Sequence, residues 1–152
     1  MNNPLRTPED YALFLYTLTD QFPSVRRSTV TFVRRGATLA RVEGELTFDD
    51  GFRLVVRERV TFDRLPVTID WYGYEVWQGE EKLYWYDSQP HPNDPVLQST
   101  HPHHKHVPPD IKHHRLPAPE MSFIRPNLPV LIRDVESSIV RRAHASEPQQ
   151  EA

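Results

Sequence analysis

The stretch from residue 40 to residue 62 alternates between apolar and polar side chains on both sides of the turn sequence Asp49-Asp50-Gly51. Such a period of two places the apolar residues on one face of a β-strand and the polar residues on the other. Gly51 can adopt the left-handed backbone conformation that a three-residue hairpin loop requires. The predicted register pairs Leu46 with Leu54, Gly44 with Val56, and Val42 with Glu58. The chain is therefore expected to build an antiparallel sheet around this hairpin.

Glu58 interrupts the apolar face of the second strand of this hairpin. The other residues expected on that face are Phe52, Leu54, Val56, Val60 and Phe62. An isolated buried carboxylate is unfavourable, so it must be paired, protonated or used in a reaction. An ion pair with a neighbouring Arg and a catalytic or partner-binding role both meet this requirement.

Helical spacing appears near both ends of the chain. Apolar residues at that spacing predict a helix from about residue 8 to residue 21, which Thr7 caps and Pro23 ends. Asn127 is predicted to cap a last helix. The apolar residues of that last helix are Leu128, Leu131, Ile132, Val135 and Ile139. Both helices can pack one face against a sheet.

Residues 67–77 and 82–87 predict a second hairpin, and it is dense in aromatic side chains. Its Trp and Tyr residues are Trp71, Tyr72, Tyr74, Trp77, Tyr84, Trp85 and Tyr86. Aromatic residues are favoured in sheets, which supports a role in the core and in a covering layer. Exposed aromatic rings beside cations would instead form a stacking surface for bases. The degree of exposure decides between these two interpretations.

These segments predict an α+β fold. We expect an antiparallel sheet of about five or six strands, packed by an N-terminal and a C-terminal helix. Residues 1–143 are expected to form a single domain, and residues 144–152 a disordered tail. Many prolines between residues 90 and 129 argue against a long helix or a central strand there.

Composition excludes several classes of protein. The net charge of −3 argues against a protein that coats nucleic acid through a broad basic surface. The chain has no cysteine, so it has neither disulfides nor thiolate nucleophiles, and any metal ligands must come from histidine and carboxylate. No apolar run reaches the roughly 18 residues that a membrane-spanning helix needs, and no secretory signal is apparent. We therefore expect a cytoplasmic protein without a membrane partner.

The sequence HPHHKHVPPDIKHHR, residues 101–115, holds six of the eight histidines. Neighbouring residues of an extended chain point to opposite faces, so His104 and His106 are expected to share one face, and His101 and His103 the other. Either pair could supply two metal ligands, with His91, Asp87 or Glu58 completing the set, although no strict metal-binding spacing is present. His104 and His106 could equally divide the acid and base roles of a reaction, because imidazole titrates near neutral pH. Contact with phosphate or an acidic partner, and a solvated surface loop, are the remaining interpretations.

The order of four motifs resembles that of the TumE-like toxins of bacterial toxin–antitoxin pairs. These motifs are GELTFDDGFRLVVRE, WYGYEVWQG, YDSQPH and PHHKHV, within residues 40–140. The resemblance implies a small cytoplasmic protein that inhibits growth when free and is neutralised by an antitoxin, typically a helix-turn-helix protein. The positions that match the family's site are Glu58, Asp87, His91, His103, His104, Lys105 and His106.

Together these observations predict a TumE-like toxin that acts as a metal-independent endoribonuclease on RNA, with no cofactor. In this hypothesis His104 and His106 supply acid and base. Lys105 and Arg57 hold phosphate. The residues expected to orient the imidazoles are Glu58, Asp87 and His91. The alternatives are a non-catalytic protein whose histidine loop binds an acidic partner or a metal, and a structural domain with a solvated loop.

Overall fold

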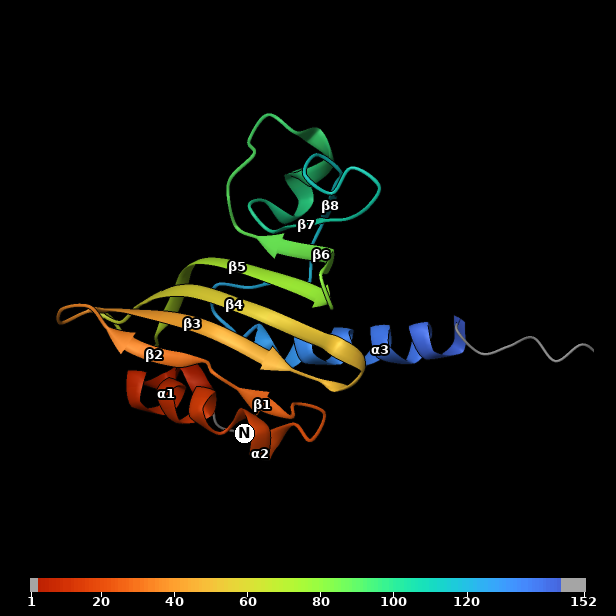
Figure 1. Cartoon of the computed structure of the whole chain (residues 1–152). Coiled ribbons are helices and arrows are strands. Elements are labelled where there is room, and N and C mark those ends of the chain that lie inside the picture. Colours follow the sequence, from red (N-terminus) through yellow and green to blue (C-terminus); the bar gives the residue numbers. More distant parts are fainter. Residues whose placement is uncertain (1–2, 146–152) are drawn as a thin grey trace, which may run out of the picture.

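The predicted hairpin forms two neighbouring strands inside the sheet in the computed structural model, which describes residues 3–145 (Figure 1). Strands β3 (Leu39–Thr47) and β4 (Phe52–Thr61) are antiparallel and pair Val42 with Glu58, which confirms the predicted register. The turn is the short 3-10 helix η2 (Asp49–Gly51). Asp50 and Gly51 both have positive φ, at 60° and 77°.

The sheet has eight strands, more than the about five or six predicted. The second hairpin, β5 (Thr68–Gln78) and β6 (Glu81–Asp87), extends it from β4. The histidine segment then adds two short strands, β7 (His104–His106) and β8 (Arg115–Pro117). Three-residue strands carry too little periodicity to be detected in the sequence, and an edge strand tolerates proline.

Two more short strands account for the other edge of the sheet. Strands β1 (Arg27–Ser28) and β2 (Thr31–Arg34) both pair with β3, at different positions along it. The backbone between them crosses close to Gly44, where a Cβ would lie 2.5 Å from the Cα of Val30. Gly44 also has a φ of 149°, so the crossing requires glycine at this position.

The helices lie on one face of the sheet (Figure 1). The predicted helix 8–21 is divided into α1 (Pro8–Tyr16) and α2 (Leu18–Gln21), after the 3-10 helix η1 (Pro4–Arg6). Thr7 caps α1 by accepting the Asp10 N–H at 3.1 Å, as predicted. The division falls at Thr17, whose hydroxyl donates to the Leu13 carbonyl at 2.7 Å.

The C-terminal helix α3 (Leu128–Ala145) packs on the same face. Tyr84 contacts Ser138 of α3, and the Tyr86 hydroxyl donates to Asp134 at 3.3 Å. The Asn127 side chain, predicted to cap α3, instead bonds Ser122 and the Tyr74 hydroxyl. The last helix includes residues 144 and 145 of the predicted tail, and residues 146–152 lie outside the described residues.

The two faces of the sheet differ sharply in composition. The face under α1 and α3, called the covered face, carries the tyrosines of β5 and β6, all of them buried: Tyr72, Tyr74, Tyr84 and Tyr86. The opposite, open face carries the three tryptophans of the same strands: Trp71, Trp77 and Trp85. This alternation follows from the period of two along each strand. Within residues 3–145, no helix is long and apolar enough to cross a membrane.

Candidate functional site

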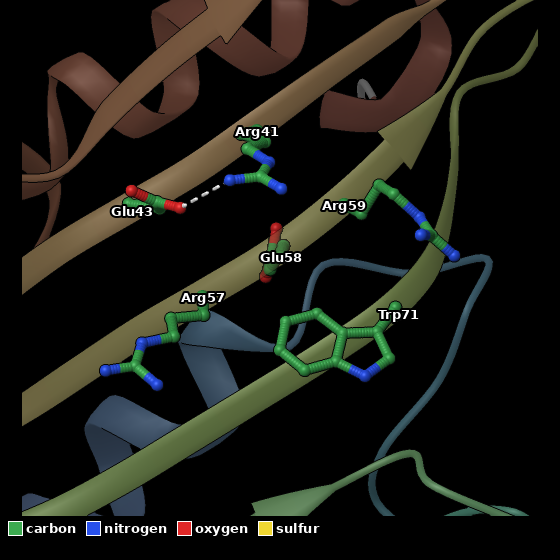
Figure 2. Close-up of a pocket in the computed structure, with 6 residues that line it drawn as sticks. All are labelled: Arg41, Glu43, Arg57, Glu58, Arg59 and Trp71. Carbon is green, nitrogen blue, oxygen red and sulfur yellow. Dashed lines mark ion pairs between the residues drawn. The ribbon is translucent and has the colours of Figure 1, made fainter.

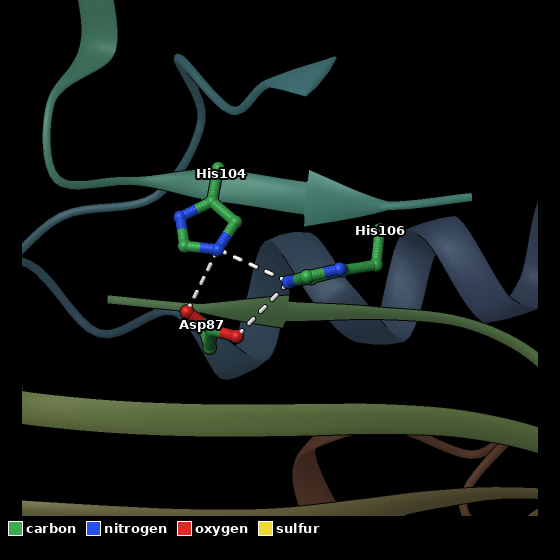
Figure 3. A group of neighbouring side chains, drawn as sticks. All are labelled: Asp87, His104 and His106. Atoms are coloured by element: carbon green, nitrogen blue, oxygen red, sulfur yellow. Dashed lines mark hydrogen bonds and ion pairs between the residues drawn. The ribbon is translucent and has the colours of Figure 1, made fainter. Parts of the chain in front are cut away.

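Asp87, His104 and His106 form a compact cluster on the open face (Figure 3). The Nε2 atom of His104 lies 2.8 Å from one oxygen of Asp87, and the Nε2 atom of His106 lies 3.1 Å from the other. The two Nε2 atoms are 3.1 Å apart. His104 and His106 are 0% and 4% exposed, so the cluster is withdrawn from water.

Strand pairing explains why these three side chains meet. Asp87, the last residue of β6, lies directly opposite His104, and Trp85 lies opposite His106. All four side chains therefore point to the same face. The ring of His106 stacks on Trp85 with 3.9 Å between centroids, which fixes the imidazole in place.

Each imidazole is oriented by a backbone carbonyl on its other side. The Nδ1 atom of His104 lies 3.0 Å from the Pro102 carbonyl, and that of His106 lies 3.0 Å from the Ile111 carbonyl. A carbonyl only accepts, so both Nδ1 atoms carry a proton and the Nε2 atoms point to Asp87.

Hydrogen bonds within the cluster shift the pKa values of Asp87 and His104 in opposite directions. Burial raises the pKa of Asp87, but hydrogen bonds from His104, His106 and the Gln89 N–H outweigh it and hold that pKa well below its usual range. Burial lowers the pKa of His104, but hydrogen bonds to Asp87 and the Pro102 carbonyl raise it above its usual value overall. Asp87 is therefore ionised at neutral pH, and His104 holds a proton more readily than a free imidazole does.

His91 and Arg115 lie beside this cluster and line a cavity of about 430 Å³. The ring of His91 meets that of His104 edge-on, with 4.8 Å between centroids. Burial, followed by the positive charges of Arg115 and His104, lowers the pKa of His91. The Nε atom of Arg115 is buried and has no hydrogen-bond partner among the described residues. A neutral imidazole and an unsatisfied guanidinium thus border one cavity.

A second cavity, of about 300 Å³, lies on the same open face over β3, β4 and β5 (Figure 2). Arg41, Arg57, Arg59 and Trp71 line it, and Trp71 is 40% exposed. Arg41 and Arg59 pair with Glu43 and Asp70, whereas Arg57 makes no ion pair within the part of the chain that the structure describes. Exposed tryptophan beside arginine is the composition of a nucleic-acid stacking surface.

The two parts of the open face are joined by strand pairing. Arg57 lies opposite Gly73, and Gly73 lies opposite Asp87. Because Gly73 has no side chain, only backbone separates Arg57 from the cluster along this row. A Cβ at Gly73 would touch the Trp71 ring at 3.7 Å, so Trp71 leans over the same gap.

A family model matches most of the chain. The family described as Toxin TumE matches residues 15–139. The chain belongs to the TumE toxin family. No curated protein and no solved structure matches it.

Membership in the TumE family suggests a toxin role for the chain and implies an antitoxin partner. The matched residues include both hairpins, the histidine segment and most of α3. They therefore contain the cluster, the two open-face cavities described above and most of the core beneath them.

Glu58 does not join the cluster of this TumE toxin, which corrects the expectation that it orients the imidazoles. It is among the residues that line the second cavity (Figure 2), but it is only 2% exposed, and its carboxylate lies on the covered face beside Tyr11 of α1. The hydroxyls of Tyr11 and Tyr74 donate to its two carboxylate oxygens. The buried carboxylate is thus satisfied by tyrosines, and neither the arginine ion pair nor a place beside the histidines is found.

Lys105 and His103 also point away from the cluster. They alternate with His104 and His106 along the chain, so they face the covered side. The Lys105 ammonium lies 4.2 Å from the Tyr84 ring centroid and 4.0 Å from Asp134. The Nδ1 atom of His103 lies 2.5 Å from the Tyr72 hydroxyl. Lys105 is therefore not placed to hold phosphate beside His104 and His106, which corrects that prediction.

Arg115 was not predicted as a site residue from the sequence, and Trp71 had no specific predicted role. Arg115 lies opposite His106 only because β8 folds back on β7. The signal was present in His113-His114-Arg115, which ends a second histidine run close to the first. For Trp71, the alternation with Tyr72 already separated the two faces, but it did not show which face the helices cover.

Proposed function

We propose that this TumE toxin cleaves phosphodiester bonds of RNA, with the reaction centre at Asp87, His104, His106 and His91. The observation that carries the proposal is the convergence of two imidazoles on one carboxylate, next to a cavity that an unsatisfied arginine borders. Buried titratable groups with shifted pKa values beside a cavity are typical of reaction centres.

His91 is the proposed proton acceptor: it takes the proton of a 2′-hydroxyl that attacks the adjacent phosphorus, and the 5′-oxygen, whose bond to phosphorus breaks, takes its proton from water. Its lowered pKa keeps the ring neutral near pH 7, and it lines the cavity where a phosphodiester would bind. His104 and His106 can act as free acid and base, as predicted from the sequence, only if one Nε2 atom leaves Asp87. The cluster is therefore assigned the role of a fixed charged centre beneath His91.

Arg115 replaces Lys105 as the proposed phosphate ligand. Its side chain lines the same cavity as His91, and its buried Nε–H lacks an acceptor. A phosphate oxygen would supply that acceptor, and guanidinium matches phosphate geometry well. Asp94 also lines the cavity, but it does not supply the acceptor that the Arg115 Nε–H lacks. Its carboxylate accepts the Val96 N–H at 3.1 Å instead.

Single-stranded RNA is the substrate form that the open face supports best. The exposed ring of Trp71 can stack on a base, and Arg57 can contact the backbone one row away from Asp87. A strand that crosses Gly73 would pass from this surface to the cluster. The implied antitoxin, proposed to be a helix-turn-helix protein, would neutralise the toxin by covering this face.

Induced expression without the antitoxin tests the proposal. Wild type is compared with Asp87→Asn and His91→Ala, and with the control His113→Ala/His114→Ala, which removes two exposed histidines. We expect growth arrest and shortened cellular RNA in wild type and control, and neither effect in the two site variants.

The same variants, purified, are incubated with a single-stranded RNA oligonucleotide. Cleavage by wild type and control alone supports the proposal. Growth arrest that persists in Asp87→Asn and His91→Ala contradicts it. Arrest by wild type with intact RNA also contradicts it and favours the non-catalytic alternative, in which the histidine segment binds a partner.

A further inference from the structure

We propose that Asp87, His104 and His106 bind one divalent transition-metal ion, and that Zn²⁺ matches the site best. This metal site uses the residues of the proposed reaction centre, but it does not require RNA cleavage. The ligand atoms of these three residues all lie within 4.8 Å of one another, which is close enough to share an ion. Within residues 3–145, no other group of three or more histidine or carboxylate side chains comes as close together.

The orientation of the two imidazoles is that of metal ligands. A histidine that binds a metal through one ring nitrogen usually donates its other N–H to a carbonyl or carboxylate. His104 and His106 both do so through Nδ1, to the carbonyls of Pro102 and Ile111. Both Nε2 atoms are left to face a common point (Figure 3).

The atoms that meet at this point are nearly all acceptors. With Nδ1 protonated, each neutral imidazole presents a lone pair at Nε2, and these lone pairs are 3.1 Å apart. The two oxygens of Asp87 add further lone pairs at 2.8 and 3.1 Å. A cation at the centre would satisfy all four atoms at once.

The carboxylate is held from outside the cluster in a way that leaves it free to bind inward. The Trp85 indole donates to one oxygen of Asp87 at 3.1 Å, and the Gln89 N–H donates to the other at 2.9 Å. Such outer hydrogen bonds fix a ligating carboxylate and set its direction. They also keep Asp87 in place when the imidazoles are neutral.

The spacing of the ligand atoms is close to that of a zinc site. Zinc–nitrogen distances near 2.0–2.1 Å place tetrahedral ligands about 3.3 Å apart. The distances from Asp87 to His104 and His106 are 2.8 and 3.1 Å, so shifts of a few tenths of an ångström would admit the ion. Two neutral imidazoles and one carboxylate also leave a net positive charge on the bound ion.

Three protein ligands leave a fourth position for water or an anion, which is the arrangement of reactive zinc sites. Asp87 is the most accessible member, with 21% of its side chain exposed. His91 lies against His104, and Arg115 lies opposite His106. The charge of Arg115 opposes the bare ion, but it would favour an anion bound at the fourth position.

Zinc titration of the untagged, metal-stripped full chain tests the site by calorimetry. Wild type is compared with Asp87→Asn and His104→Gln/His106→Gln. The matched control is His113→Gln/His114→Gln, which removes the same number of imidazoles from the exposed part of the segment. We expect one Zn²⁺ per chain in wild type and control, and a loss of affinity of about 100-fold or more in the cluster variants.

Co²⁺ provides a second readout, because four-coordinate Co²⁺ absorbs strongly in visible light. This measurement uses the wild-type protein, so it does not depend on whether a variant folds. We expect these bands in wild type and their loss when Zn²⁺ is added. Equal zinc affinity in all variants, a loss confined to the control, or no four-coordinate Co²⁺ spectrum in wild type would overturn the proposal. A loss confined to the control would mean adventitious binding only.

The outcomes separate the metal site from the proposed function. Zinc binding at the cluster without RNA cleavage supports the site and rejects the nuclease. RNA cleavage that is unaffected by chelation, in a chain that binds no Zn²⁺, rejects the site and leaves the nuclease with imidazoles alone.

Discussion

Glu58 and Asp87 lie on opposite faces of one sheet, although both carboxylates are held by hydrogen bonds. Glu58 accepts from two tyrosines beneath the helices, and Asp87 binds two imidazoles on the open face. The first carboxylate belongs to the core and the second to the candidate site. Stability and activity are therefore expected to respond to different substitutions.

Replacement of Glu58 with alanine is expected to lower the free energy of unfolding by about 3 kcal/mol, because two buried tyrosine hydroxyls lose their acceptor and a cavity opens. Urea unfolding measures the loss. Glu58→Gln retains one acceptor and the volume, so it should cost about 1 kcal/mol. Zinc affinity of the folded fraction should not change. A Glu58→Ala protein as stable as wild type would show that the tyrosines do not need this carboxylate.

The stability that Glu58 provides should depend on pH. Burial raises the pKa of Glu58 above its ordinary value of 4.5, against opposing hydrogen bonds from Tyr11 and Tyr74. A raised folded pKa means that the contribution is fully present below the unfolded pKa and is lost as pH rises through the folded pKa.

Urea unfolding of wild type and Glu58→Gln across that interval checks the sign. The stability of wild type relative to Glu58→Gln should fall as the pH rises above 4.5, where the unfolded chain begins to ionise this group. Other carboxylates, such as Asp87, titrate in both proteins and cancel in the difference. A difference that stays constant or grows with pH would contradict a raised pKa.

Trp71→Ala is expected to weaken the binding of single-stranded RNA by about tenfold, because stacking of one base on an aromatic ring contributes about 1–3 kcal/mol. Arg57→Ala should also weaken binding and reduce its dependence on salt, because one phosphate contact is lost. Fluorescence anisotropy of a labelled oligonucleotide at several salt concentrations measures both effects.

Arg133→Ala serves as the control for these two variants, because it removes an exposed arginine of α3 from the other side of the sheet. Its affinity for RNA should equal that of wild type. If Arg133→Ala weakens binding as much as Arg57→Ala does, the contact with RNA is not specific to the open face.

His103→Ala should affect stability and leave zinc binding intact. The ring of His103 stacks on Tyr72, with 5.6 Å between centroids, and shares a hydrogen bond with its hydroxyl. Loss of both contacts should cost about 1–2 kcal/mol of unfolding free energy. The adjacent His104→Ala should lose zinc affinity. Equal zinc affinity in both variants would show that the alternation of faces does not separate their roles.

The sequence was sufficient to predict what depends on local pattern. The period of two placed Val42 opposite Glu58 and directed His104 and His106 to a common face, and both are observed. The helical spacing located α1 and α3. These features follow from residues a few positions apart.

The remaining features depend on pairing between distant segments. Asp87 meets the histidines through the register of β6 with β7, and Arg115 joins them through β8. Glu58 finds its partner Tyr11 in a helix whose docking position no local pattern specifies. Lys105 was grouped with the histidines by composition, although the same alternation that united His104 and His106 placed it on the other face.

The last strands of the sheet, β7 and β8, have three residues each and end the sheet on the side away from β1. A host that benefits from silencing this protein therefore does not need to unfold it. Under the proposed function, one substitution among the histidines of β7 would remove the harm and preserve a folded relative. Such a relative could still engage the antitoxin, and would thereby act as a decoy that releases active copies.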